Sequence, residues 1–185
     1  MMGLTTMDET VQRVIAKQAI YELSCRYSRG LDRLDRQALL QVFSRNAYCE
    51  YGFINGTPEE FVAYAMNALR GHIANQHMVG NHLIEFEGDQ AFGEIYFNAY
   101  HKFEVDGVNQ DMIIAGRYLD RYEIEDGQWK MAYRSERVDW SRSEPSKDPY
   151  FANAPKTLLG ARSGDAVYQH DNRSWPDGSS AGLDD

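Results

Sequence analysis

The spacing of apolar residues changes along the chain near residue 77. Before that point they recur every three or four positions, which is the period of a helix buried on one face. After it, runs rich in Ile, Val, Phe and Tyr are separated by short segments that contain glycine, as expected for strands and turns. The pattern therefore predicts helices first and a β-meander afterwards.

Three helices are expected in the first part of the chain. The first ends near Gly30, since glycine commonly terminates helices, and its apolar stripe comprises Val11, Val14, Ile15, Ala19, Leu23, Tyr27 and Leu31. The second begins after Asp35. The third begins at Thr57-Pro58-Glu59-Glu60, where Thr caps the helix and the carboxylates meet its positive end. Between the last two, residues 47–54 are expected to form a strand that ends at an Asn55-Gly56 turn.

Four strands are expected in the second part, over residues 77–87, 91–105, 111–124 and 128–140. Short turns between them imply antiparallel neighbours. Strict alternation would place His77 and Ile84 on opposite faces although both should point inward, so we expect a β-bulge near Gly80. The fold class predicted is α+β, with three N-terminal helices packed on a strongly curved antiparallel sheet.

The domain itself is expected to span residues 1–140. Residues 141–170 carry three prolines and scattered apolar residues, and we expect an ordered extension over the cavity or a subunit interface. Residues 171–185 are polar and rich in Gly, Ser and Asp, which predicts a disordered tail.

Composition narrows the classes of function. The net charge of −9 argues against a nucleic-acid partner, which requires a basic surface. The chain has neither an apolar run long enough to span a membrane nor a signal-peptide pattern, so a cytoplasmic location is expected. Two cysteines, Cys25 and Cys49, make no disulfide framework and fit a reducing compartment.

Four residues carry the candidate chemistry: Asp32, Tyr51, His77 and His101. Each is polar or titratable and stands where the pattern predicts an inward apolar side chain or a tight connection. His101 shares its strand face with Phe97, which predicts that it points inward. A carboxylate and two imidazoles in an apolar pocket can move protons without a cofactor, and none is expected.

Other interpretations of these residues remain open. Asp32 could cap the second helix, although Asp35 is better placed to do so, and either histidine could be structural. His72, His77 and His82 are spaced by five, which suggests a metal site. Neither a strand nor a helix brings side chains at that spacing together, so no metal is expected.

Two segments resemble a known family. Arg26-Tyr27, followed by residues 30–35, is similar to the junction between the first two helices of SnoaL-like proteins. Residues 76–81, Gln-His-Met-Val-Gly-Asn, resemble a segment of scytalone dehydratase. The resemblance covers about residues 10–140. It implies the NTF2-like (cystatin-like) cone and the branch that holds scytalone dehydratases and hexachlorocyclohexane dehydrochlorinases.

The resemblance also implies roles for residues. Asp32 matches the carboxylate that pairs with the catalytic histidine, matched by His77; His101 matches a second histidine, and Tyr51 a tyrosine that contacts substrate through water. Arg134 falls where dehydrochlorinases keep a cationic residue. Residues 113–119 lack the Ser and Asn of dehydratases, so scytalone itself is not the expected substrate. The remaining expected substrate contacts are Tyr27, Tyr48, Phe53, Met66, Met112 and Tyr118.

These observations predict a cofactor-independent lyase that acts on a small aromatic or polycyclic substrate. His77, held by Asp32, would remove a proton, and water, halide or formaldehyde would leave, the last from a lignin-type diaryl compound. Relatives form dimers or trimers, so a homodimer or homotrimer is expected. The alternatives are a non-catalytic β-subunit of a ring-hydroxylating dioxygenase, a binding module, and a ketosteroid isomerase in which His77 would be idle.

Overall fold

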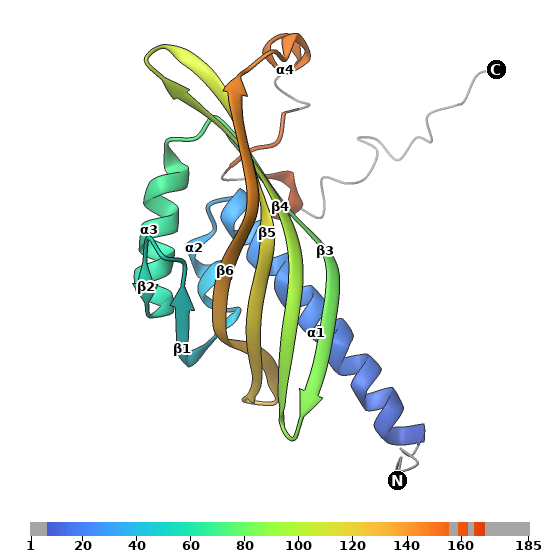
Figure 1. Cartoon of the computed structure of the whole chain (residues 1–185). Helices are drawn as coiled ribbons and strands as arrows, with labels where there is room; N and C mark the ends of the chain where they lie inside the picture. Colours follow the sequence, from blue (N-terminus) through green and yellow to red (C-terminus); the bar gives the residue numbers. More distant parts are fainter. Residues whose placement is uncertain (1–6, 156–158, 163–164, 169–185) are drawn as a thin grey trace, which may run out of the picture. The chain divides into compact units, whose positions relative to one another are not determined.

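The computed structural model describes residues 7–155, 159–162 and 165–168 (Figure 1). The chain divides into two compact units after Lys147. The elements of the first unit are α1 (Met7–Asp32), α2 (Arg36–Leu40), β1 (Phe43–Glu50), β2 (Asn55–Gly56), α3 (Pro58–Arg70), β3 (Ala74–Glu87), β4 (Gln90–Val105), β5 (Val108–Glu125) and β6 (Gln128–Pro145). The second unit contains α4 (Pro149–Asn153) and a 3₁₀ turn (Ala166–Tyr168). The tail predicted over residues 171–185 lies outside the described residues.

The six strands form one sheet in the order β2-β1-β6-β5-β4-β3, and α1, α2 and α3 lie on one side of it (Figure 1). The four long strands β3–β6 form the predicted antiparallel meander. The prediction of a wholly antiparallel sheet was wrong, because β1 runs parallel to β6. Turn signals determine the direction only of the strands they join, and β1 is separated from β6 along the chain by α3 and four strands.

Several strand boundaries also differ from the predictions; β1 and β3, for example, begin earlier, at Phe43 and Ala74. Asn55-Gly56 is not the turn but a short strand that pairs back onto β1, and residues 51–54 form the turn, with Gly52 at φ +73°. The side chain of Asn55 accepts hydrogen bonds from the amides of Tyr51 and Gly52, both at 3.0 Å, and so stabilises this turn. At the other end of the unit, β6 continues past Trp140 to Pro145, where it still pairs with β5.

The apolar stripe predicted for α1 is correct only in its C-terminal part. Leu23, Tyr27 and Leu31 are buried, whereas Val14 is 62% exposed, and Val11 and Ile15 are also exposed. Figure 1 shows the N-terminal end of α1 extending past β3, so its first turns have little sheet to pack against. Sequence periodicity identifies an apolar face but not where the opposite surface ends.

The junction between α1 and α2 sets the position of Asp32. The helix continues two residues beyond Gly30, whose missing side chain allows close packing: a Cβ there would lie 3.0 Å from the Cβ of Leu39. Leu34 then adopts a left-handed conformation (φ 52°), and Asp35 caps α2 by accepting a hydrogen bond from the amide of Ala38 at 2.9 Å. Because Asp35 caps the helix, the carboxylate of Asp32 is left to make other contacts.

Two further local predictions are confirmed. Thr57 and Glu60 form a capping box at the start of α3. The pairing of β3 with β4 shifts between Val79 and His82, which is the bulge predicted near Gly80. The core lies between the helices and the sheet and includes Ile20, Leu39, Val62 and Ile95.

Candidate active site

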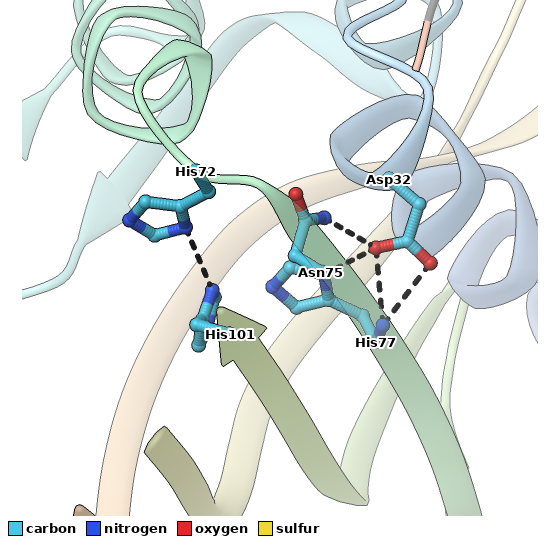
Figure 2. Close-up of polar contacts among 5 residues, drawn as sticks. All are labelled: Asp32, His72, Asn75, His77 and His101. Atoms are coloured by element: carbon cyan, nitrogen blue, oxygen red, sulfur yellow. Dashed lines mark hydrogen bonds and ion pairs between the residues drawn. The ribbon is translucent and has the colours of Figure 1, made fainter. Parts of the chain in front are cut away.

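The carboxylate of Asp32, at the C-terminal end of α1, accepts hydrogen bonds from two residues at the start of β3, Asn75 and His77 (Figure 2). The Nδ1 of His77 donates to Oδ1 at 2.7 Å, and its backbone amide lies 3.1 Å from both oxygens. Asn75 adds a hydrogen bond from Nδ2 at 2.7 Å. An ionised carboxylate only accepts, so this contact holds the proton of a neutral His77 on Nδ1 and leaves Nε2 as the acceptor.

The two predicted histidines are brought together from adjacent strands. The imidazole rings of His77 and His101 are 5.2 Å apart between centroids and nearly perpendicular, at 81°. On its other side, the Nδ1 of His101 lies 3.3 Å from the Nδ1 of His72, which follows α3 (Figure 2). One of these two nitrogens must donate and the other accept, so one ring carries a proton on Nδ1 and the other does not. His72 was considered in the sequence only as a metal ligand.

A cavity of about 190 Å³ lies between the helices and the sheet, and both His77 and His101 line it. Its wall is mostly aromatic and aliphatic, with side chains from α1, α3, the β1–β2 turn and β3–β6. The lining residues are Tyr27, Leu31, Tyr51, Phe53, Ile54, Phe61, Tyr64, Ala65, Ala68, Leu69, His77, Phe97, Ala99, His101, Ile114, Tyr118 and Glu136. Apolar walls with a few convergent polar groups are typical of small-molecule sites.

Phenol groups form part of this wall. The hydroxyls of Tyr27 and Tyr51 are hydrogen-bonded at 2.6 Å, and the ring of Tyr51 stacks on Phe61 at 4.2 Å. Burial raises the pKa of Tyr27, Tyr51 and Tyr118 above the usual range of a phenol. These hydroxyls therefore stay protonated near neutral pH and can donate hydrogen bonds to a bound molecule.

Arg134 is fully buried but is not among the residues that line the cavity. Its Nε and Nη2 donate to the two oxygens of Asp120 at 2.8 and 2.6 Å. The guanidinium also lies over the rings of Tyr27 and Tyr118, at 4.2 and 4.1 Å, and these rings separate it from the cavity. Burial lowers the pKa of Arg134, whereas the charge and the hydrogen bonds of Asp120 raise it. The net effect is a pKa above the usual range of a guanidinium. Arg134 is therefore not placed at the cavity wall, and its contact with substrate stays a prediction.

The other expected substrate contacts divide into two groups. Tyr27 and Tyr118 line the cavity, and Phe53 borders it while 90% exposed. Tyr48, Met66 and Met112 do not line it. Tyr48 points to the other side of the sheet, where it stacks on Tyr133, because Ala47 and Cys49 are the inward residues of β1. Met66 is buried in the core and is not among the residues that line the cavity.

Three residues at the site were missed in the sequence: Asn75, His72 and Glu136. Asn75 shares its strand face with His77, and Glu136 shares one with Arg134, so alternation could have identified both. Burial raises the pKa of the Glu136 carboxyl, and the charges of His77 and Arg134 act in the opposite direction.

Within the described ranges, no cluster of three or more His, Cys, Asp or Glu side chains is arranged to hold a metal ion. The ring of His82 packs against Tyr21 of α1, with 4.9 Å between centroids, and its Nδ1 lies 2.7 Å from the carbonyl oxygen of Gly80. Both cysteines are free thiols. None of the helices in the described part of the chain has the length and hydrophobicity needed to cross a membrane.

A curved sheet covered on one side by helices, with an apolar cavity between them, is the architecture of the NTF2-like, cystatin-like fold. The SnoaL-like domain family matches residues 12–135, more than half of the chain. The chain belongs to this family, as its motifs predicted. Its sequence has no significant match among curated proteins.

Solved structures of related fold include members of the predicted branch. A putative scytalone dehydratase from Novosphingobium aromaticivorans is 20% identical (TM-score 0.66; 75% of this chain and 93% of that chain covered). The hexachlorocyclohexane dehydrochlorinase LinA-type3 from Novosphingobium barchaimii is 23% identical (TM-score 0.63; 74% and 94%). A protein of unknown function from Mycobacterium tuberculosis is 25% identical (TM-score 0.60; 73% and 78%). These likenesses confirm the NTF2-like fold.

Proposed function

We propose that this protein is a cofactor-independent lyase that removes a proton from a small aromatic substrate in the cavity. The observation that carries the proposal is the hydrogen bond between Asp32 and His77, with side chains only 10% and 8% exposed, beside an apolar cavity that His77 lines. A dehydratase and a dehydrochlorinase of the same fold support a reaction in which a C–H bond is broken and a group leaves.

In the proposed reaction, Nε2 of His77 accepts a proton from carbon, or from a hydroxyl if formaldehyde leaves. The imidazolium that forms is stabilised by the carboxylate of Asp32, which lies 2.7 Å from Nδ1. When water or halide leaves, the electrons of the broken C–H bond form a double bond as the leaving group departs, and His101 or the hydroxyl of Tyr51 donates a proton to it where one is needed. When formaldehyde leaves, the electrons of the O–H bond form its C=O bond, the C–C bond breaks, and the electron pair left on carbon takes a proton from His101 or Tyr51. Each such acid or base step contributes about 10²–10⁴-fold.

The size of the cavity limits the substrate. Its volume of about 190 Å³ is only slightly larger than the ~150 Å³ cavity that holds a benzene molecule in an engineered protein. A single substituted ring or a small fused system therefore fits. A diaryl or larger polycyclic substrate requires movement of the rim at Phe53, so we favour the smaller part of the predicted substrate range.

A direct test is turnover of a panel of hydroxylated and halogenated single-ring compounds and one γ-hydroxymethyl diaryl compound, with EDTA present. Wild type is expected to convert at least one compound, and His77→Gln to lose most of that activity. His82→Gln is the matched control, because His82 is on the same strand but does not line the cavity.

Absence of conversion in wild type, together with co-purification of a larger oxygenase chain, would overturn the proposal in favour of the β-subunit alternative. Tight binding of a panel compound without conversion would favour a binding module. Homo-oligomerisation and a cytoplasmic location stay predictions.

A further inference from the structure

Glu136 is a carboxyl group in the cavity that the proposed reaction does not use. It lies on β6 opposite Tyr118 of β5, and on the same strand face as Arg134. Among the described residues it is the one carboxyl group that lines the cavity, together with His77 and His101. An acidic side chain in a wall that is mostly aromatic and aliphatic imposes a charge preference on the molecule that binds there.

The neighbouring charged groups already have partners. Asp32 accepts hydrogen bonds from His77 and Asn75, and Arg134 is bound by Asp120. By contrast, no hydrogen bond or ion pair to the carboxylate of Glu136 is found within the described part of the chain. A carboxylate that faces a cavity without a donor has acceptor capacity left for a ligand.

We propose that Glu136 determines substrate specificity: it accepts a hydrogen bond from a hydroxyl group on a neutral aromatic substrate and repels aromatic anions. This inference rests on the proposed function only in taking the cavity as the substrate site. Two like charges in a confined, poorly solvated site repel strongly, and a hydroxyl donor gains a charge-assisted hydrogen bond. The substrate class is therefore a hydroxylated, uncharged ring, not an aromatic acid.

The preference can be measured without turnover. We would titrate the full-length protein at pH 8 with 4-methylphenol, 4-methylbenzoate and 4-methylbenzylamine, which share one ring and differ in the charge of the substituent. Imidazole ¹⁵N shifts of His77 and His101 report binding in the cavity. We expect the phenol to bind at least about 10-fold more tightly than the benzoate.

The matched variants are Glu136→Gln and Glu104→Gln. The first keeps the shape and an acceptor oxygen but removes the charge, and the second removes the same charge from an exposed position on β4. We expect Glu136→Gln to reduce the preference for phenol over benzoate at least about fivefold and Glu104→Gln to leave it unchanged.

Two results would overturn the assignment of Glu136: equal binding of phenol and benzoate by wild type, or an unchanged preference in Glu136→Gln. Tightest binding of the benzylamine would overturn the neutral, hydroxylated substrate class in favour of a cationic one. Each of these leaves the cavity as a ligand site, and with it the proposed function. If none of the three probes shifts the His77 and His101 signals, the cavity is not the substrate site and both proposals fail.

Discussion

Two buried pairs of charged or titratable side chains lie on the same side of the sheet, and they differ in what surrounds them. Arg134 and Asp120 have fully buried side chains, and aromatic rings cover the guanidinium. Asp32 and His77 are nearly as buried, but His77 also lines the cavity. Burial of a charged pair is therefore not enough to identify an active site. What distinguishes the second pair is one titratable nitrogen that a ligand can reach.

The largest effect on stability is expected from Asp120→Ala. It leaves Arg134 buried without its counter-ion, which costs about 3–5 kcal/mol of unfolding free energy. It also removes the acceptor of the Tyr122 hydroxyl, bound at 2.5 Å. Urea unfolding measures the loss, with the exposed Glu87→Ala as control. A loss below about 1 kcal/mol would show that the pair is not essential to the core.

His77→Gln should have the opposite effect, with a large loss of activity and a small change in stability. Activity on a converted compound should fall about 10³-fold, because the base is removed. The unfolding free energy should change by only about 1 kcal/mol, because Asn75 and the backbone amide still donate to Asp32. Initial rates and urea unfolding on the same preparation separate the two effects. A large loss of stability with activity retained would make His77 a structural residue.

Asp32→Asn is expected to reduce activity about 10²-fold while substrate binding is kept. The amide can donate to Nδ1 of His77, which moves the imidazole proton to Nε2, and it cannot stabilise the imidazolium by charge. Steady-state kinetics should show the effect in kcat and little in KM. An unchanged kcat would mean that Asp32 only supports the fold.

The smallest expected effect is that of Glu136→Gln on the pH dependence of stability. Burial raises its pKa in the folded state, so the folded protein binds this proton more tightly than the unfolded chain. Its contribution to stability is then lost as the pH rises above the unfolded pKa of about 4.3. Glu136→Gln should therefore stabilise the protein at pH 8, by about 1 kcal/mol or less, and not at pH 4. Thermal unfolding at both pH values tests this, and equal shifts at both would contradict it.

Local chemistry predicted much of the fold. The cap at Asp35, the capping box at Thr57 and the bulge near Gly80 all follow from residue type and alternation within one element. The parallel pairing of β1 with β6 could not be predicted in this way, because it depends on contacts between segments far apart in the sequence.

The same distinction applies to the site. Asp32, His77 and His101 were identified from residue type and resemblance, and the structure brings all three together. Tyr48 and Tyr51 were both expected to face the substrate, although their odd spacing within the strand predicted over residues 47–54 already implied opposite faces. In the structure Tyr48 stacks on Tyr133 outside the cavity, whereas Tyr51 lies in the turn after β1 and lines it. The cover of Arg134 by Tyr27 and Tyr118 depends on three elements that only the folded chain brings together.

The central claim is that Asp32 holds His77 with its proton on Nδ1, so that Nε2 can accept a proton in the cavity. Long-range ¹H–¹⁵N correlation spectra of the imidazoles test this most directly, since the chain has only five histidines. We predict the Nδ1–H tautomer for neutral His77, with its Nε2 signal shifted when 4-methylphenol binds. An Nε2–H tautomer, insensitive to Asp32→Asn, would contradict the assignment of His77 as the base.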